Sequence, residues 1–292
     1  MKPQSYGPFP YRPINRRPKL EWPNGAPLAL WVIPNIETFA LDEKMPSGPG
    51  GSDGQVPDVN TWSYRDYGAR VGIFRIMEVL SRHGVRATAA LNSDTCDVYP
   101  QIVEEALALG WEFMGHNQSN TRRLNTVDDE AGVIKASLDR IAKATGKRPA
   151  GWLSAGMQET WNTLNHLVEV GVTYVADWVN DDQPYRMTVG NSTIVSIPYS
   201  VETNDRRAYD FHHYTTREFE ELLKRQFDVL YREGEQSGRV MALAVHPFLS
   251  GAPHRIGALD AALDYICSRD GVWKATGAEI VAHYLKQGSE SP

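Results

Sequence analysis

Short apolar segments alternate with amphipathic ones along most of the chain. Leu28 to Pro34, with the sequence L-A-L-W-V-I-P, is a continuous apolar run of the kind that forms a strand buried on both faces. Tyr67 to His83 instead places its apolar residues on one side of a helix, and Gly84 directly behind it is a stop signal. The pattern predicts a buried strand followed by a helix on the surface.

The same alternation continues along the chain and predicts a sheet of parallel strands. We expect further strands at Ala87 to Asn92, Trp111 to His116, Ala150 to Ser154, Thr173 to Asp177 and Val240 to His246, and helices at Tyr99 to Leu109, Asp128 to Thr145, Thr160 to Val170, Thr216 to Glu233 and Ile256 to Ser268. Right-handed crossovers between such units wind the sheet into a barrel or an open doubly wound layer. No linker divides these segments, so residues 26–292 are predicted to form a single catalytic domain.

Residues 1–25 do not share this alternation. They are rich in proline, aromatic residues and arginine, a composition that forms neither a regular helix nor a central strand. We therefore expect an extended N-terminal arm. Two interpretations are open: a disordered tail, or an arm that packs on a neighbouring subunit and so removes Phe9, Tyr11 and Trp22 from water.

Composition and charge narrow the class of protein. The chain has 292 residues and a net charge of -6, which argues against a nucleic acid or an anionic membrane surface as the main partner. No apolar run reaches the roughly eighteen residues of a membrane span, and the N-terminal segment lacks the apolar region of a secretory signal. The only cysteines, Cys96 and Cys267, suit a reducing compartment better than a disulfide scaffold. We expect a cytoplasmic protein.

Glycine-rich phosphate loops are missing from the sequence. No G-x-G-x-x-G follows the first predicted strand, and no G-x-x-x-x-G-K-[ST] occurs, so dinucleotide and nucleoside triphosphate cofactors are not expected. The glycine-rich run Gly48 to Gly54 opens no helix and is expected to be a mobile loop.

Polar residues collect where the predicted strands end. Glu37 follows the first strand, and His116, Ser154, Asp177 and His246 end later ones. In a parallel barrel the carboxyl ends of the strands open onto one face, where the following loops build the active site. The sequence therefore predicts one shared site at this face.

Several motifs, in this order, resemble the polysaccharide deacetylase (NodB-homology) superfamily, and the D-D-x-P-Y and T-N-D elements resemble its allantoinase and cyclic imide hydrolase branch. The resemblance covers roughly residues 25 to 285 and implies a distorted (β/α)7-type barrel that hydrolyses an amide C–N bond. The motifs are N-I-E-T (Asn35 to Thr38), G-H-N-Q-S-N (Gly115 to Asn120), R-P-A-G-W-L-S (Arg148 to Ser154), Y-V-A-D-W-V-N-D-D-Q-P-Y (Tyr174 to Tyr185), V-E-T-N-D-R-R (Val201 to Arg207) and A-V-H-P-F-L-S-G-A-P-H-R (Ala244 to Arg255).

The chain departs from the family pattern at the metal ligands. The pattern has an Asp-Asp pair, a base followed by a metal ligand, where this chain has Glu37 and Thr38; it has H-x-x-x-H where this chain has His116 and Asn120. A catalytic zinc site normally has three protein ligands and an open position for water. We therefore expect no metal or other cofactor, with zinc as the alternative. The resemblance implies that Glu37 is the general base and that His246 assists the leaving group.

Without a metal, the substrate has to supply part of its own activation. The nitrogen of a cyclic imide or hydantoin is shared by two carbonyls and leaves more readily than an ordinary amine, so we expect ring opening of a small cyclic imide or ureide. Candidate substrate-binding residues are the hydrogen-bonding His116 and Asn120, the aromatic Trp152, Trp178 and Tyr185, the acidic Asp177, Asp181 and Asp182, and the basic Arg207 and Arg255.

Three other functions stay open: an allantoinase, a metal-dependent N-deacetylase of amino sugars, and a barrel that binds a small ligand without catalysis. The aromatic arm and the resemblance together lead us to expect a homo-oligomer, with a tetramer favoured.

Overall fold

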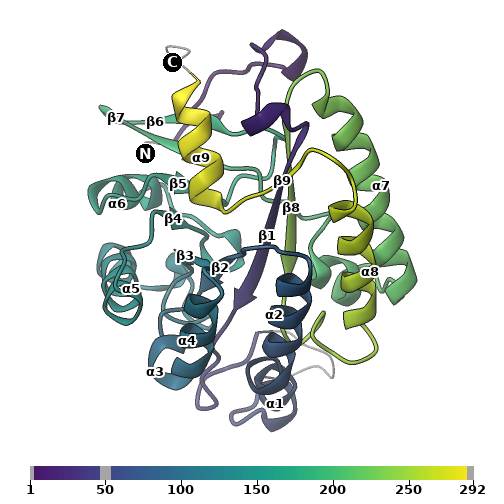
Figure 1. The fold of residues 1–292 in the computed structure, drawn as a ribbon. Coiled ribbons are helices and arrows are strands. Elements are labelled where there is room, and N and C mark those ends of the chain that lie inside the picture. The colour runs from purple at the N-terminus through teal and green to yellow at the C-terminus, as the bar shows by residue number, and fades with distance from the viewer. Residues whose placement is uncertain (1–2, 47–53, 288–292) are drawn as a thin grey trace.

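A computed structural model describes residues 3–46 and 54–287, so the predicted glycine-rich loop lies outside the described residues except for Gly54. The strands are β1 (Leu28–Ile36), β2 (Thr88–Leu91), β3 (Glu112–Gly115), β4 (Gly151–Trp152), β5 (Tyr174–Val175), β6 (Tyr185–Val189), β7 (Ser192–Ser196), β8 (Arg239–Val245) and β9 (Val272–Lys274). The α-helices are α1 (Val59–Tyr67), α2 (Ile73–Arg82), α3 (Thr95–Val98), α4 (Pro100–Ala108), α5 (Glu130–Thr145), α6 (Thr163–Glu169), α7 (Thr216–Gly234), α8 (Ile256–Cys267) and α9 (Gly277–Lys286). Figure 1 shows how the helices surround the curled sheet.

The sheet of the described residues runs in the order β6-β7-β5-β4-β3-β2-β1-β8. Its pairs are parallel except for the antiparallel hairpin β6–β7. β1 pairs along most of its length with β8, while its other edge pairs first with β9 and then, at its end, with β2. This central position carries the residue that follows β1 into the middle of the carboxyl face.

Two backbone contacts close the curled sheet into a distorted barrel. Val240 N–H donates to the Asp182 carbonyl at 2.9 Å near the start of β8, and Ala244 N–H donates to the Thr203 carbonyl at 3.1 Å near its end. Irregular chain, rather than a regular strand, therefore covers the free edge of β8. The fold class predicted from the sequence is confirmed.

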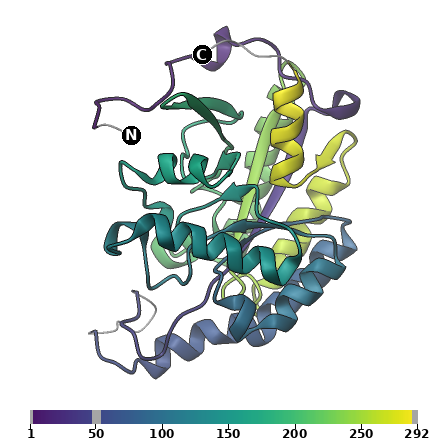
Figure 2. The ribbon, with the colours of Figure 1, turned by 90° about the vertical axis from the view of Figure 1, so that its left-hand side faces the viewer.

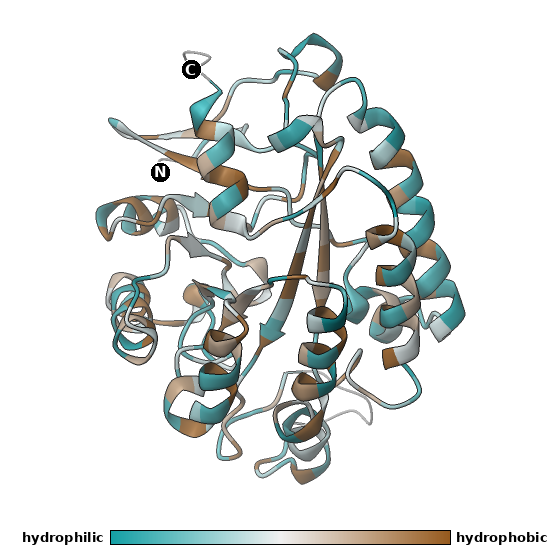
Figure 3. Cartoon of the chain, in the orientation of Figure 1, coloured by the Kyte–Doolittle hydropathy of each residue, from teal (hydrophilic) through white to brown (hydrophobic). Residues whose placement is uncertain are grey.

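Alternation of side chains along the central strands separates two parts of the core. Leu28, Leu30 and Val32 of β1 pack outward against the helices, while Trp31 and Ile33 point into the barrel. In Figure 3 the central strands carry long brown, apolar stretches, whereas the surrounding helices show both brown and teal residues. Both faces of these strands are buried, which explains why their sequences read as continuous apolar runs.

The predicted strands and helices are present, but the prediction missed the hairpin β6–β7 and the elements α1, α3, β9 and α9. The hairpin has a two-residue connection, Gly190 and Asn191, with Gly190 at φ +59°. A Gly-Asn pair between two β-branched runs is a recognised hairpin signal. The prediction missed it because neither run is long or continuously apolar.

The described part of the N-terminal arm lies against its own barrel. Trp22 donates its indole N–H to the Arg239 carbonyl at 2.8 Å, and Thr188 N–H of β6 donates to the Pro8 carbonyl at 2.7 Å. The arm runs along one end of the molecule, beside the end of α9 (Figure 2). No helix in the described part of the chain combines the length and apolarity that a bilayer crossing demands. The expected cytoplasmic location stays a prediction.

Candidate active site

Glu37 lies at the centre of the carboxyl face, directly after β1. Its side chain is 5 % exposed, and its Oε1 accepts a hydrogen bond from Asn120 Nδ2 at 2.7 Å. His116, which follows β3, and His246, which follows β8, place their Nε2 atoms 3.8 Å and 3.9 Å from the same oxygen. Four residues predicted to share one site are therefore in one cluster.

Positive charge around Glu37 keeps its carboxyl group ionised. Burial by itself would raise the pKa, but the imidazoles of His116 and His246 and the guanidinium of Arg206 outweigh it. Together they hold the pKa of Glu37 at about 2. The carboxylate is therefore charged throughout the physiological pH range.

Asp205 holds His246 in place and favours its protonated form. One Asp205 oxygen accepts the His246 backbone N–H at 2.7 Å, and the other lies 2.7 Å from His246 Nδ1. Ser250 donates its hydroxyl to the same carboxylate at 2.6 Å. Burial disfavours the imidazolium, but Asp205 and Glu37 outweigh it and raise the pKa of His246 above its usual value of 6.5. Asp205 belongs to the T-N-D element of the sequence, but its contact with His246 was not predicted.

A backbone carbonyl orients the ring of His116. Its Nδ1 lies 2.7 Å from the Leu153 carbonyl, which can only accept, so Nδ1 carries a proton and Nε2 is directed at Glu37. Three atoms of this cluster are buried without a hydrogen-bond partner among the described residues: Glu37 Oε2, His116 Nε2 and Asn120 Oδ1. A buried polar atom without a partner is costly, so the two oxygens among them, Glu37 Oε2 and Asn120 Oδ1, are set up to receive hydrogen-bond donors.

The residues at the family's metal positions do not fit a zinc site of that family. The Thr38 hydroxyl is 2.8 Å from the Thr95 hydroxyl, and Asn120 turns its NH2 group, a donor, toward Glu37. Over residues 3–46 and 54–287, no group of three or more His, Cys, Asp or Glu side chains could hold a metal ion. Of the family's three ligand positions only His116 keeps a metal-binding side chain.

Two predicted substrate-binding residues instead support the floor of the site. Trp152 is fully buried and donates its indole N–H to the Ser154 hydroxyl at 3.0 Å, so the prediction that it walls a substrate is wrong. Asp177 accepts both the Ser154 backbone N–H and the Ser154 hydroxyl, each at 2.7 Å. Burial raises the pKa of Asp177, and burial together with Asp177 raises that of Glu159, whose Oε1 accepts the Trp178 indole N–H at 3.1 Å.

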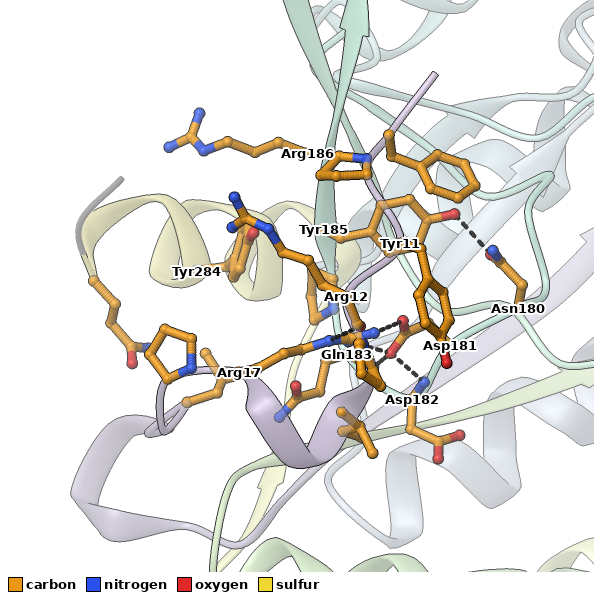
Figure 4. A pocket seen from close by; sticks show the side chains of 18 of the residues that line it. Tyr11, Arg12, Arg17, Asn180, Asp181, Asp182, Gln183, Tyr185, Arg186 and Tyr284 are labelled. Atoms are coloured by element: carbon orange, nitrogen blue, oxygen red, sulfur yellow. Dashed lines mark hydrogen bonds and ion pairs between the residues drawn. The ribbon is translucent and has the colours of Figure 1, made fainter. Parts of the chain in front are cut away.

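Asp181 and Asp182 lie away from the catalytic cluster, so their predicted place at the rim of the site is wrong. The Asp182 carbonyl pairs with Val240, six residues before His246 on an extended strand, which places it on the order of 20 Å from that histidine. Asp181 forms a bidentate pair with Arg17 of the arm at 2.7 and 2.5 Å. Figure 4 shows this pair beside a cavity of about 570 Å³ between the arm and the barrel.

The aromatic and basic candidates also contact residues outside the cluster. Trp178 and Tyr185 pack against Phe9 of the arm, with ring centroids 5.5 and 4.8 Å apart. Arg255 lies 4.2 Å over the Tyr209 ring, and Arg207 lies 4.7 Å over the Phe211 ring. The guanidinium group that lowers the pKa of Glu37 belongs instead to Arg206, which was not among the predicted residues.

Known proteins resemble this chain in both sequence and structure. The family model described as polysaccharide deacetylase matches residues 61–175, a range that includes His116 and Asn120. A peptidoglycan deacetylase from Helicobacter pylori is 22% identical over 286 residues, which are 86% of this chain and 97% of that protein.

Two crystal structures share most of the fold. A probable polysaccharide deacetylase from Pseudomonas aeruginosa PAO1 has a TM-score of 0.86 and PuuE allantoinase one of 0.84. Each is 25% identical in sequence, and each alignment covers 94% of this chain and 96% of the other. These matches confirm the resemblance that the sequence motifs indicated, including its allantoinase branch.

Proposed function

We propose that this chain, which belongs to the polysaccharide deacetylase superfamily of hydrolases, opens the ring of a small cyclic imide or ureide without the help of a metal ion. The observation that carries the proposal is the pair formed by Glu37 and His246. The two side chains are 3.9 Å apart, and their surroundings lower the pKa of the carboxyl group and raise that of the imidazole. Environments that push two pKa values apart assign a base and an acid.

The chemistry uses these two groups in sequence. Glu37 takes a proton from a water molecule while the water oxygen attacks a ring carbonyl carbon. His246 then gives its Nε2 proton to the ring nitrogen as the C–N bond breaks, leaving a carboxylic acid and a free amide or urea. Asp205 stabilises the imidazolium before this transfer and keeps Nε2 directed at the site.

The low pKa of Glu37 limits the substrate. A carboxylate whose pKa is about 2 is a weak base, and general acid–base catalysis is most effective when the pKa lies near the working pH. The leaving group must therefore supply part of the driving force. A nitrogen between two carbonyls does so because its negative charge is delocalised, whereas the nitrogen of an N-acetyl sugar does not.

The unpartnered atoms of the site favour a ring that carries N–H groups. Glu37 Oε2 and Asn120 Oδ1 are acceptors, and water O–H and imide or ureide N–H groups are the donors that would satisfy them. Among ureides, allantoin is the first to test because the structure of PuuE allantoinase aligns with 94% of this chain at a TM-score of 0.84.

The proposal is tested by elemental analysis of the purified protein together with a substrate panel. The panel contains succinimide, hydantoin, dihydropyrimidine, allantoin and N-acetylated sugars, each assayed with and without a chelator. We expect turnover of at least one ring amide, unchanged by the chelator, in protein without stoichiometric zinc. Stoichiometric zinc with deacetylation of the sugars would overturn the proposal.

A further inference from the structure

Arg65 of α1 lies between the segments that follow the two catalytic residues. Its side chain is buried, with the residue 4 % exposed. The guanidinium carbon is 4.3 Å from the ring centroid of Phe39 and 5.8 Å from that of Phe248. Phe39 comes two residues after Glu37, and Phe248 comes two residues after His246. One guanidinium thus contacts both loops that carry the proposed base and acid.

Other contacts fix the Arg65 helix against the base loop. The Trp62 indole N–H donates to the Phe39 carbonyl at 2.9 Å, and Arg65 donates an η nitrogen to the Pro46 carbonyl at 3.1 Å. Both donors belong to α1, one turn apart. The chain after Glu37 is therefore bound to α1 by its backbone as well as by the Phe39 ring.

The turn after α1 packs directly on the acid loop. A Cβ atom on Gly68 would lie 2.5 Å from the Phe248 nitrogen, and one on Gly72 would lie 2.0 Å from the Pro247 oxygen. The backbones can approach this closely only because both positions are glycine. The Phe248 ring in turn packs against His246, with centroids 5.8 Å apart. The acid loop is thus held by the same helical segment as the base loop.

We propose that Arg65 is a positioning residue that fixes the distance between the Glu37 loop and the His246 loop. The inference rests on the proposed roles of Glu37 and His246. Arg65 stacks on side chains that follow these residues, so it acts through the loops and not on the reacting atoms. Its planar group lies 4.3 Å from the centroid of one aromatic ring and 5.8 Å from that of another, and a lysine ammonium does not stack on aromatic rings equally well.

A purely stabilising role does not explain a guanidinium at this position. Burial lowers the pKa of Arg65 to about 10, although the nearby Glu37 raises it, so the charge is held in surroundings that disfavour it. An apolar side chain of similar length would fill the same space without this cost. The charged, planar group is explained if the site depends on the geometry that it imposes.

The test uses Arg65→Met, Arg65→Lys and the control Arg70→Met. Arg70 is on the turn that continues the same helical segment, its side chain is 74% exposed, and it forms a 3.9 Å ion pair with Asp66. We expect Arg65→Met to lower kcat by about 100-fold with KM changed less than about twofold, since a displacement of about 1 Å costs that much. Arg65→Lys should lose less, and the control should match the wild type.

A second measurement works without any substrate. Crystal structures of the wild type and Arg65→Met give the distance from Glu37 Oε1 to His246 Nε2, which is 3.9 Å here and should increase in the variant. If the Met variant does not fold, Arg65→Lys provides both measurements. A wild-type kcat in the Lys and Met variants, or an unchanged separation, would overturn the inference. If the wild-type protein opens no ring amide, the proposed function fails while the distance still decides the role of Arg65.

Discussion

The two ends of the barrel both carry buried carboxylates, but these carboxylates differ in how many hydrogen-bond partners they have. At the carboxyl end, Glu37 Oε2 has no hydrogen-bond partner in the described chain, and two imidazoles stand too far from Oε1 to bond it. At the other end, both oxygens of Asp181 bond to Arg17, and backbone N–H groups of Asp182 and Gln183 add two further bonds. The satisfied carboxylate fixes the arm in place, whereas the unsatisfied one remains available to react.

Neutralising Glu37 should cause the largest loss of activity, and it tests whether the two carboxylates have different roles. Glu37→Gln should lower kcat/KM by about 10³-fold, because it removes the proposed base without changing the shape of the side chain. Asp181→Asn is the matched change at the other end and should leave kcat/KM within about twofold. Steady-state kinetics on the best substrate, with circular dichroism as a check on folding, compare the two. Equal losses in both variants would contradict the division of roles.

Removing the charge that supports the acid should have the next largest effect. Asp205→Asn should lower kcat/KM by about 10²-fold, since Asp205 orients His246 and raises its pKa. The alkaline fall in activity should also move to lower pH in the variant. Ser250→Ala, which removes one contact of the same carboxylate but no charge, should leave that fall in place. A pH–rate profile that does not move would count against Asp205 as the charge partner.

The pH dependence of the wild-type protein follows from the lowered pKa of Glu37 and the raised pKa of His246. Glu37 stays ionised from neutrality down to a pKa of about 2, so it should cause no loss of kcat/KM between neutrality and its usual pKa of 4.5. The pKa of His246 is raised above 6.5. The stability that its protonated form contributes is therefore complete below pH 6.5 and is lost as the pH rises through the folded-state pKa. Activity should therefore fall on the alkaline side. A steep fall between neutrality and pH 4.5 that Glu37→Gln abolishes would contradict this assignment.

Breaking the ion pair of the arm should affect stability more than catalysis. Arg17→Met removes two charge-assisted hydrogen bonds to Asp181, whose side chain is 9% exposed, and should cost about 2 kcal/mol of unfolding free energy. The kcat should stay within about twofold of the wild type. Urea unfolding and kinetics on the same samples give both values. Lys19→Met, at an exposed ion pair of the arm, is the control with almost no effect.

Deleting the arm should change catalysis least, and the same deletion tests whether the arm holds subunits together. We propose a homotetramer, in which the arm contacts a neighbouring subunit as well as its own barrel. The arm exposes Tyr6, Tyr11 and Ile14 at 53%, 76% and 39%, which supports such a contact. Deleting residues 1–24 should shift the gel-filtration peak to a smaller species, with kcat nearly unchanged. An unchanged elution volume would show that the arm serves its own barrel alone.

The sequence placed a residue in the site correctly where the residue type and its position at the end of a strand were enough to locate it. Glu37, His116 and His246 each end or follow an apolar strand, and parallel strands bring their carboxyl ends to one face. It failed for Asp181, because the chain between Asp177 and β6 leaves that face and reaches the start of β8. Closeness in sequence to a site residue did not mean closeness in space.

By itself, the sequence determined the alternation of strands and helices, the resemblance to the polysaccharide deacetylase superfamily, and the departure from its metal-ligand pattern at Thr38 and Asn120. These follow from local periodicity and from motifs. Only the tertiary structure decided which charged groups have partners. Asp205 meets His246 from 41 residues away, and Arg65 reaches loops that follow two distant strands. Hydrogen-bond satisfaction is a property of contacts between distant segments, so local sequence patterns do not reveal it.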